Sequence, residues 1–541
     1  MKRNKRKKGL TLFFFMMLAL SIFFAGCSND NENSKEKEED NMLTTSWPRD
    51  VGEMNPHIYN PSQMFAQTMV YEPLISYGEN GELVPKLAES WDISEDGKKY
   101  TFHIRKNVQF SDGSNLDAAI IKRNFDSLLK NMNATGGHTW LGVMTKIDEF
   151  TVVNEHTLEM TLTEPYYAAL QELAVARPVR ILGAAGFPKG DDTSKGVKEA
   201  IGTGPWILEE YKVDEYAIYK RNDNYWGEVP NVEKIKVKII PDAETNVLAL
   251  EKGELDLIVG EGVMSIDTFK ELEASGEYET QVSAPYATRQ LIMNTTRDTL
   301  SDIRVREALH MSFDKATMVE SVTSGLEEKA DNILSTNFPY TADIEPQVVV
   351  YDQEKAAKLL DEAGWTLRDG ATVREKDGKP LEIELMYDAA ETLQKTIAET
   401  LQSEWAAVGV KLNIVSEELP MQVKRLKAND FDINLFSNYG SPYDPHTFVN
   451  IVANDGFGFN VAIASYEKKD ELTQQINNVL VSTDEKERQE LYTLILTTLQ
   501  DQHSIIPISY INKIAVYKKN VTGFKFAANR DENSFTGIGL K

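Results

Sequence analysis

The chain has 541 residues, of which 41% are hydrophobic and 26% are charged, and its formal net charge is −26. This length suffices for two or three domains, and the acidic balance argues against a nucleic-acid partner, whose phosphates need lysine and arginine. A single cysteine leaves no intramolecular disulfide and no cysteine metal cluster.

The N-terminus has the composition of a secretory signal over residues 1–26. A basic head over 2–8 precedes an apolar stretch from Leu10 to Phe24 that is short for a bilayer-spanning helix, and two small residues then lead into Cys27. The arrangement resembles the lipobox of bacterial lipoprotein precursors, although Phe24 stands where that family usually has leucine. The resemblance implies cleavage before Cys27, a lipid on its thiol, and a place on the extracytoplasmic face of the cell membrane. An uncleaved N-terminal anchor with an incidental cysteine is the alternative.

The stretch after the cysteine predicts a tether. Residues 28–40 (SNDNENSKEKEED) contain no apolar side chain and cannot bury enough surface to fold, so we expect a disordered leash over 27–41. No later segment has a long apolar run without charges, so the body from Met42 onward is expected to lie outside the membrane. Its acidity would repel anionic lipids, and attachment is therefore expected to depend on the anchor.

Strand and helix signals alternate along the body. Residues 99–110 (KYTFHIRKNVQF) alternate apolar and polar side chains, which is typical of a half-buried strand. Asp117 is a candidate N-cap for the helix that follows, and Gly409 is predicted to end a helix with apolar residues every four positions from Leu393 to Trp405. Three further elements are expected: helices at 305–314 and 354–365, and a strand at 410–417. The pattern predicts a mixed α/β protein with several lobes.

No local motif indicates catalysis. The chain has no Walker loop, no GxSxG nucleophile elbow and no HExxH pair, and its seven histidines are scattered. The glycines of GTGPWIL (202–208) do not match a dinucleotide-binding fingerprint. A triad assembled from distant positions stays open, but nothing in the sequence favours one, so we expect a protein that is not an enzyme.

Several motifs occur in the order found in one protein family. They are LVPKLAESWDISEDGKKYTFHIRKNVQFSDG (83–113), GTGPW (202–206), NDNYWG (222–227), and MNTT (293–296) followed by IRVREALHMSFDK (303–315). Together they resemble the extracytoplasmic solute-binding proteins of peptide and nickel ABC importers, over essentially the whole body. The resemblance implies an α/β, periplasmic-binding-protein-like fold (type II, cluster C), in which two lobes, one enlarged by an extra domain, close over a ligand about a hinge.

The resemblance also implies how the chain is divided. The core of lobe 1 would combine residues 42–75, 200–285 and 505–541, the extra domain would span 76–199, and lobe 2 would span 286–504. The hinge would lie near 289–294 and again near 505–510.

Other segments resemble the nickel-binding members of this family more closely than the peptide-binding members. They are NPHIYNPSQMFAQTMVYEPL (55–74), TWLGV (139–143), YYAALQELAVARPVR (166–180), IGTGPWIL (201–208) and GSPYDPHTF (440–448). The resemblance implies that a monomer without a cofactor captures nickel and delivers it to ABC permease subunits in the membrane.

The residue types present suggest how nickel would be held. Nickel(II) prefers nitrogen and oxygen ligands such as imidazole and carboxylate. Seven scattered histidines make a high-affinity site built only from protein atoms a poor expectation. We therefore expect nickel to arrive bound to a small chelator with carboxylates, such as histidine or a metallophore. The protein then needs a cation for the carboxylates and flat apolar walls for the chelate.

The resemblance assigns these roles to positions of this chain. Arg177 matches the family arginine that binds chelator carboxylates, which a guanidinium grips with two parallel hydrogen bonds. A structural salt bridge is the alternative for Arg177, and the neighbouring Arg180 is expected to be structural. The positions expected to line the pocket carry aromatic or soft apolar side chains: Tyr59, Met64, Trp140, Tyr439 and Tyr443. Ordinary core packing is the alternative for Tyr59, Met64 and Trp140, and Tyr439 stands where relatives have tryptophan.

Two departures from the nickel-binding relatives bear on direct ligation of the metal. Gly137 stands where they have arginine, and residues 451–459 (IVANDGFGF) lack the histidine that reaches the metal in them. His446 and His138 are the substitute candidates for metal ligands, with a structural role as the alternative for each. Asn454 is a candidate hydrogen-bonding partner of the chelator.

Two other functions stay open. One is a peptide-binding or other metallophore-binding protein of the same importer family. The other is a surface receptor or chaperone-like protein on the same scaffold, without a transport role.

Overall fold

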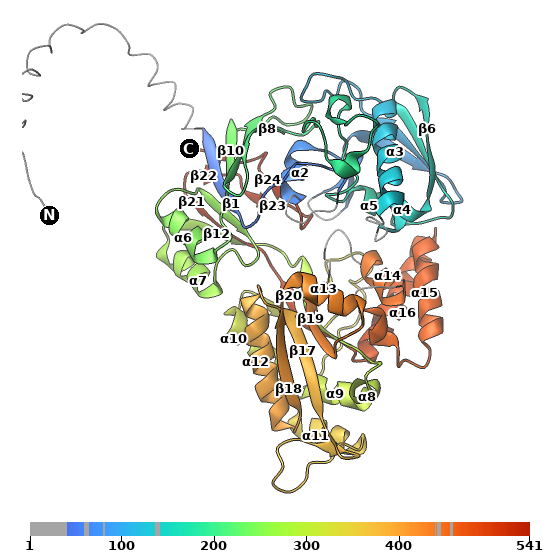
Figure 1. Cartoon of the computed structure of the whole chain (residues 1–541), viewed down its shortest axis with the longest axis vertical. Coiled ribbons are helices and arrows are strands. Elements are labelled where there is room, and N and C mark those ends of the chain that lie inside the picture. The colour runs from blue at the N-terminus through green and yellow to red at the C-terminus, as the bar shows by residue number, and fades with distance from the viewer. Residues whose placement is uncertain are drawn as a thin grey trace, which may run out of the picture. The chain divides into compact units, whose positions relative to one another are not determined.

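The computed structural model describes residues 41–58, 64–78, 82–135, 141–438, 440, 445–454 and 458–541. Residues 43–541 form one compact unit. Among the described residues, the strands form a seven-stranded, a six-stranded and a four-stranded sheet together with small two-stranded ribbons, and helices pack on the sheets (Figure 1). The predicted mixed α/β class is confirmed.

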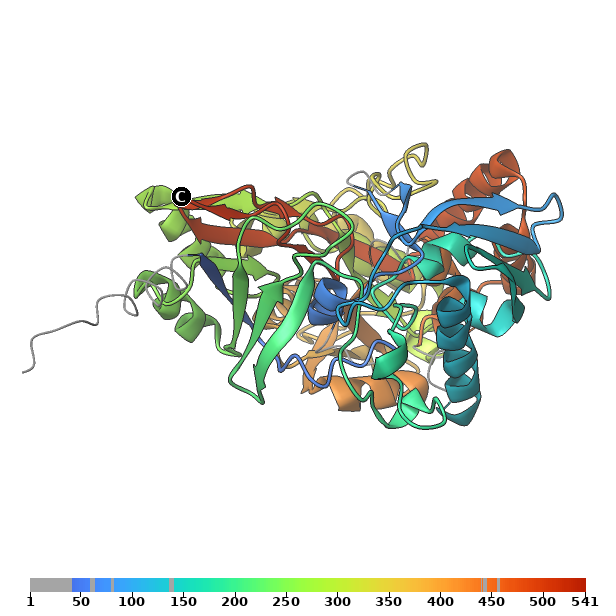
Figure 2. The same cartoon turned by 90° about the horizontal axis from the view of Figure 1, so that it is seen from above.

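The seven-stranded sheet joins distant parts of the chain. In spatial order its strands are β12 (Tyr278–Val282), β21 (Ile514–Lys518), β11 (Leu257–Gly260), β1 (Met42–Trp47), β10 (Lys234–Ile239), β9 (Tyr216–Arg221) and β8 (Trp206–Lys212). Figures 1 and 2 show blue β1 and red β21 among the green strands. The segments between these strands contain the helices α2 (Met64–Val70), α6 (Ala243–Glu251) and α7 (Ile266–Ser275).

The six-stranded sheet is the centre of a second α/β region with its own hydrophobic core. Its strands, in spatial order, are β14 (Glu328–Lys329), β20 (Ile505–Ile511), β13 (Ala287–Met293), β19 (Ile433–Ser437), β17 (Glu382–Asp388) and β18 (Lys411–Glu417). The helices of this region are α8 (Asp298–Ser301), α9 (Ile303–Met311), α10 (Lys315–Thr323), α11 (Gln353–Glu362), α12 (Thr392–Ala407) and α13 (Leu419–Lys427). The helices predicted at 305–314, 354–365 and 393–405 and the strand at 410–417 are confirmed, and Gly409 has the positive φ of a helix terminator.

The four-stranded sheet is antiparallel and carries the first predicted strand, which ends at Ile104 and does not extend to Phe110, because a turn follows at residues 106–107. Its order is β4 (Ala88–Ile93), β5 (Lys99–Ile104), β7 (Thr157–Leu162) and β6 (Ile147–Asn154), with helices α3 (Ala118–Thr135), α4 (Gly142–Lys146) and α5 (Ala169–Leu173). Strand β5 buries alternate residues, as its sequence predicts. The Oδ1 atom of Asp117 accepts a hydrogen bond from the amide of Ile120 at 2.7 Å, so Asp117 caps α3.

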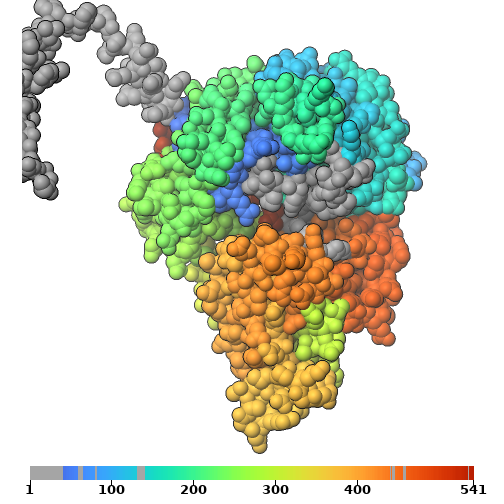
Figure 3. Space-filling model, viewed as in Figure 1, coloured from blue at the N-terminus to red at the C-terminus, as the bar shows by residue number. Residues whose placement is uncertain are grey.

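Three helices near the C-terminus pack against the region of the four-stranded sheet. They are α14 (His446–Asn454), α15 (Lys469–Val481) and α16 (Glu485–Asp501). Their apolar residues share one continuous core with that region, and the amide of Tyr167 donates to the carbonyl of Leu480 at 3.2 Å. Figure 3 shows the red surface of these helices meeting the cyan surface of the four-stranded region.

Short elements complete the described chain. The two-stranded ribbons are β2 (Ile75–Tyr77) with β3 (Leu83–Pro85), β15 (Glu375–Lys376) with β16 (Lys379–Pro380), β22 (Val521–Thr522) with β25 (Gly539–Leu540), and β23 (Lys525–Phe526) with β24 (Asn533–Ser534). Single 3₁₀ turns occur at Ala184–Gly186, Thr193–Lys195 and Asn460–Ile463. Along the described residues, no helix has the length and apolarity needed to cross a membrane.

The expected hinge positions differ from the places where the chain passes between sheets. Residues 289–294 and 505–510 fall largely in β13 and β20, both of which belong to the six-stranded sheet. The chain connects this sheet to the seven-stranded sheet through 283–286 and 512–513. Strand β13 is buried along its whole length and bonded on both edges, so its torsion angles are fixed, whereas a short connection can change them. Strand β20 therefore belongs to the six-stranded sheet, whose other strands lie within the predicted lobe 2 (286–504), and not to the predicted core of lobe 1. The other domain boundaries stay a prediction.

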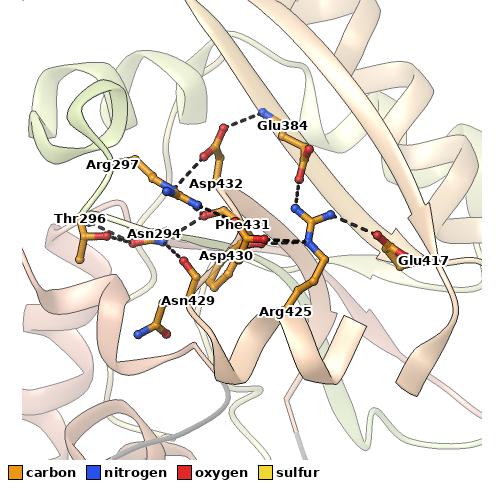
Figure 4. A network of polar contacts seen from close by, with 10 residues as sticks. All are labelled: Asn294, Thr296, Arg297, Glu384, Glu417, Arg425, Asn429, Asp430, Phe431 and Asp432. Atoms are coloured by element: carbon orange, nitrogen blue, oxygen red, sulfur yellow. Dashed lines mark hydrogen bonds and ion pairs between the residues drawn. The ribbon is translucent and has the colours of Figure 1, made fainter. Parts of the chain in front are cut away.

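Ion pairs tie α13 to the strands beside it (Figure 4). Arg425 on α13 forms ion pairs with Glu384 of β17 and, at 3.2 Å, with Glu417 of β18. Arg297 pairs with Asp432, which directly precedes β19, at 3.1 Å. Because these groups are partly exposed, each pair is expected to contribute at most about 1 kcal/mol.

Two of the motifs seen in the sequence meet in the structure at Glu72. This carboxylate is buried and accepts hydrogen bonds from the Thr203 hydroxyl at 2.9 Å, the Tyr225 hydroxyl at 2.7 Å and the Trp226 indole at 2.7 Å. Lys86 forms an ion pair with it at 2.9 Å. GTGPW and NDNYWG therefore meet at one buried acid, which ties the two motifs together in the fold.

The two glycines of GTGPW are required by close backbone packing. A Cβ at Gly202 would lie 2.0 Å from the carbonyl oxygen of Val70, and one at Gly204 would lie 2.5 Å from that of Met69. Only glycine permits such an approach. The motif thereby fixes the end of α2 and the start of the segment that carries Glu72.

A buried histidine pair makes stability depend on pH. The Nδ1 atoms of His310, in the last turn of α9, and His503, after α16, lie 3.1 Å apart. Burial, followed by repulsion from Lys315, holds the pKa of His310 well below its ordinary value, and burial lowers the pKa of His503. The folded state therefore keeps both rings neutral, whereas the unfolded chain binds protons at these histidines below about pH 6.5. The free energy of unfolding therefore decreases as the pH falls below that value.

Replacing His310 with glutamine should flatten this acid response. Thermal or urea unfolding between pH 6.5 and 5 should lose about 1 kcal/mol less per pH unit in the variant than in the wild type, because one proton uptake is removed. The exposed His103, which pairs with Asp92 at 2.9 Å, supplies the control His103→Gln. Equal slopes in His310→Gln and the wild type would contradict the assignment.

Candidate functional site

Most of the sequence-predicted pocket residues lie outside the described residues. These are Tyr59, Trp140, Tyr439, Tyr443 and His138, together with the lipidation candidate Cys27. Met64 begins α2, and only its backbone is described. The roles expected for these residues stay predictions. The structure describes the remaining three candidates, Arg177, His446 and Asn454.

Arg177 lies in the loop after α5 and is 4% exposed. Its peptide bond to Pro178 is cis. The neighbouring Arg180 is held as a structural residue, because its guanidinium donates to the carbonyls of Val175 and Tyr71, both at 3.3 Å, and forms an ion pair with Glu532. The expectation for Arg180 is confirmed. The loop is thus anchored through Arg180, and Arg177 lies three residues before that anchor.

A cavity of about 890 Å³ lies between the four-stranded region, the connections between the two larger sheets, and α14. Its walls are rich in aromatic rings, with two cations at one end, and the residues that define its character are Tyr77, Tyr167, Tyr286, Phe338, Tyr340, Phe526, His446, Lys513 and Arg530. The described lining includes Gln171 of α5 but not Arg177. The volume is near the upper end of the roughly 300–1,000 Å³ usual for small-molecule sites.

His446 is the one sequence-predicted site residue in the described lining of this cavity. It is the first residue of α14, is 2% exposed, and its Nε2 lies 3.7 Å from Oε1 of Glu172. Burial lowers the pKa of His446 to about 3, so the imidazole is neutral at physiological pH. Neutral imidazole is the form that binds metals. Whether His446 reaches a metal stays a prediction, since its ring faces Glu172 and Tyr167.

Glu172 is a buried acid that the sequence reading missed. It lies on α5 and is 1% exposed, and it accepts hydrogen bonds from the Tyr166 hydroxyl at 2.6 Å and from the amide of Val143 at 2.7 Å. Burial raises the pKa of Glu172 to about 7, against the opposing effect of these hydrogen bonds. Its position within YYAALQELAVARPVR was visible in the sequence, but its burial was not.

Asn454 lies in a different cavity from His446. This smaller cavity, of about 390 Å³, lies between α4, α14 and α15. The side-chain amide of Asn454 donates to Asn450 and Asn477, both at 3.1 Å. The structure therefore does not bring Asn454 together with His446.

A cluster of aromatic residues joins the four-stranded region to α16 beside the large cavity. The hydroxyls of Tyr167 and Tyr492 are 2.5 Å apart, and the guanidinium of Arg488 lies 5.0 Å from the centre of the Tyr167 ring. Tyr340 stacks on Tyr492 with ring centres 4.9 Å apart, and its hydroxyl accepts a hydrogen bond from Arg488 at 3.0 Å. Tyr167 thus serves both as a cavity wall and as a contact between regions.

Replacing Tyr167 with phenylalanine should weaken this contact by about 1–2 kcal/mol, because the Tyr492 hydroxyl loses its partner in a buried place. The midpoint of urea or thermal unfolding should then fall. Tyr216→Phe, which removes an exposed hydrogen bond from Tyr216 of β9 to Glu210 of β8, is the control. An unchanged unfolding midpoint would show that the contact contributes little.

Comparison with known proteins places the chain in a family. Residues 82–460 match the family of bacterial extracellular solute-binding proteins, family 5, middle. The chain is 38% identical to the nickel-binding periplasmic protein of Escherichia coli (strain K12), over 92% of this chain and 94% of that protein. It is 28% identical to the dipeptide-binding protein of the same organism, over 87% of this chain and 89% of that protein.

A solved structure of a relative has a similar fold. NikA from Brucella suis, solved in complex with Fe(III)-EDTA, has a TM-score of 0.89 and 40% identity, and the match covers 92% of this chain and 100% of that one. The two-lobed α/β fold expected from the sequence is confirmed. The chain belongs to family 5 of the bacterial extracellular solute-binding proteins.

Proposed function

We propose that this protein captures nickel as a complex with a small chelator, such as histidine or a metallophore, and delivers it to an ABC importer. The observation that carries the proposal is the 38% identity, along 92% of the chain, to a nickel-binding periplasmic protein. The 40% identity to NikA from Brucella suis, in complex with Fe(III)-EDTA, supports a chelated metal as the ligand.

The large cavity has the chemistry that such a ligand needs. Aromatic walls can pack against a flat chelate, and cations can pair with carboxylates that do not coordinate the metal. In this proposal Arg177 binds a chelator carboxylate, and the chelate is packed by Tyr59, Met64, Trp140, Tyr439 and Tyr443. His446 or His138 supplies any protein ligand to the metal. Asn454 is omitted, because its amide is bonded to Asn450 and Asn477 in the other cavity.

The transport cycle follows from a ligand that touches two regions at once. Contacts to both regions are made only when they are closed together, so the ligand favours the closed state. The closed form then docks on the permease subunits. Lipid on Cys27 would keep the protein at the membrane, and the tether of 27–41 would let it turn.

Calorimetry on the full chain, purified in detergent, tests the ligand. Nickel chloride with L-histidine, citrate or EDTA should give stoichiometric binding in at least one arm, whereas nickel chloride alone, each chelator alone, and di- and oligopeptides should bind much more weakly. The reason is that the cavity would contact the chelate mainly through the chelator.

Two results would count against the proposal. Tighter binding of a peptide than of any nickel complex would favour the peptide-binding alternative. Equal affinity for nickel with and without chelator would mean that side chains of the protein hold the metal.

A further inference from the structure

An ion pair joins the two larger sheets beside the connections through which the chain passes between them. Glu261 directly follows β11 of the seven-stranded sheet, and Arg289 lies in β13 of the six-stranded sheet. One carboxylate oxygen of Glu261 lies 3.9 Å from a guanidinium nitrogen of Arg289, and the other accepts a hydrogen bond from the Tyr286 hydroxyl. Tyr286 belongs to the connection at 283–286, so Glu261 contacts both this connection and the strand that follows it.

Arg289 is fixed on the side of the six-stranded sheet. Its side chain is 2% exposed, and it donates a hydrogen bond to Glu327, which directly precedes β14, at 3.1 Å. The other oxygen of Glu327 accepts a hydrogen bond from the Ser509 hydroxyl of β20. Among the described residues, Nε of Arg289 has no hydrogen-bond partner. A buried guanidinium in this condition gains from a second carboxylate, and Glu261 supplies one from the other sheet.

Another carboxylate faces this pair from the six-stranded region. Glu391 is the N-cap residue of α12, and its side chain makes no hydrogen bond to the helix. The charged groups that act on Glu391 are Glu261 and Arg49 from the seven-stranded region, and Arg289 and Asp388 from its own region. Burial, followed by repulsion from Glu261, raises the pKa of Glu391 to about 7. Glu391 therefore changes its charge near neutral pH and, when ionised, repels Glu261.

We propose that Glu261 and Arg289 form a latch across the hinge, and that ionisation of Glu391 weakens it. The latch favours the arrangement of the two sheets seen here, because opening at 283–286 and 512–513 would separate Glu261 from the buried guanidinium. Ionised Glu391 opposes this latched arrangement, since two carboxylates from different sheets then face each other. The latch sets the fraction of ligand-free protein that is already closed, which changes the apparent affinity for any ligand.

The direction of the pH effect follows from proton linkage. Glu391 binds its proton more tightly in the latched arrangement than in one where Glu261 has moved away, so latching takes up protons. Lowering the pH from 8 to 6 should therefore raise the ratio of latched to opened protein roughly three- to tenfold, for one coupled proton. The ratio should stop rising below about pH 4.3, where Glu391 is protonated in both arrangements.

Distances between spin labels on the ligand-free full chain, purified in detergent, test the proposal. Cys27→Ser removes the only native thiol, and Asp126→Cys on α3 and Glu354→Cys on α11 supply two exposed labelling sites. Double electron–electron resonance then measures the distance distribution between the four-stranded and six-stranded regions at pH 6 and pH 8. In this labelled background, the short-distance population should be larger at pH 6.

Glu261→Gln tests the ion pair. It should lower the ratio of latched to opened protein at pH 6 roughly fivefold, because the partly buried pair is lost, and it should remove most of the pH response. Glu209→Gln is the matched control. The Glu209 side chain has 35% exposure against 34% for Glu261, and it pairs with a cation, Lys234, at 3.0 Å, but within the seven-stranded sheet. This control should behave like the labelled background.

Glu391→Gln tests the group that weakens the latch. Because glutamine stays neutral, the variant at pH 8 should show the distance distribution that the labelled background shows at pH 6, with no further change between the two. Glu418→Gln is its control, since Glu418 is also an N-cap glutamate without a side-chain cap, at the start of α13. Glu418→Gln should keep the full pH response.

Two results would overturn the proposal. Distance distributions of Glu261→Gln that match those of Glu209→Gln would show that the ion pair does not hold the sheets together. A pH response that persists in Glu391→Gln would show that another group drives it. Thermal unfolding of each variant checks that it is folded. No ligand is present, so nickel binding can fail while the latch stands, and the latch can fail while nickel binding is retained.

Discussion

Glu72→Ala is expected to lower the free energy of unfolding by about 3–5 kcal/mol. The substitution leaves three buried or half-buried donors, from Thr203, Tyr225 and Trp226, without their acceptor, and it leaves Lys86 without its counter-ion. Burial would lower the pKa of Lys86, but attraction to Glu72 and Tyr225 raises it above its ordinary value. Urea unfolding followed by circular dichroism measures the change.

The effect should reach beyond the cluster itself. The carbonyl of Glu72 accepts from the amide of Ile181 at 3.1 Å, and the carbonyl of Tyr71 accepts from Arg180, so this segment holds the loop that carries Arg177. Glu228→Ala, at an exposed acid close in sequence to Trp226, should change the unfolding free energy by less than about 0.5 kcal/mol. A loss below 1 kcal/mol for Glu72→Ala would mean that the donors find other partners.

Arg177→Gln is expected to weaken binding of the nickel chelate by roughly 100-fold, or about 3 kcal/mol, if this guanidinium pairs with a chelator carboxylate. The cost is large because the arginine is buried, so a carboxylate brought to it would lose water and gain no replacement in the variant. Calorimetry with the nickel complex bound by the wild type measures it, and Arg177→Lys should restore part of the affinity through charge alone.

The competing structural role of Arg177 predicts a different pattern. A salt-bridged arginine with no ligand would lower the melting temperature on substitution and leave the affinity of the folded protein unchanged. Melting temperature and affinity are therefore measured together on Arg177→Gln. Arg221→Gln, at the half-buried end of β9, serves as the control for loss of one positive charge.

The class of the fold and several elements were predictable from the sequence, because they depend on local patterns. Alternating apolar and polar residues predicted β5, and apolar residues at every fourth position predicted α12. The predicted N-cap Asp117 starts α3, and Gly409, which has a positive φ, follows the end of α12 as predicted. Family membership followed from long motifs such as residues 83–113. Two residues of other motifs, Glu72 and Gly202, make packing contacts inside the fold.

The connections between the sheets were not predictable at residue level. The expected hinge segments lie largely within β13 and β20. The sequence could not reveal this, because an apolar run looks the same in a central strand of a sheet and in a segment that crosses between lobes. Only pairing on both edges of β13 shows that it is fixed and that 283–286 and 512–513 make the connections.

By itself, the sequence determined the α/β class, the order of the main elements and the family, since these arise from neighbours along the chain. Only the tertiary structure placed Asn454 and His446 in different cavities, buried Glu172 beside His446, and set Lys513 and Arg530 against Tyr286. Such arrangements join residues that lie tens or hundreds of positions apart. Their energies depend on burial and on distance in space, which no local spacing records.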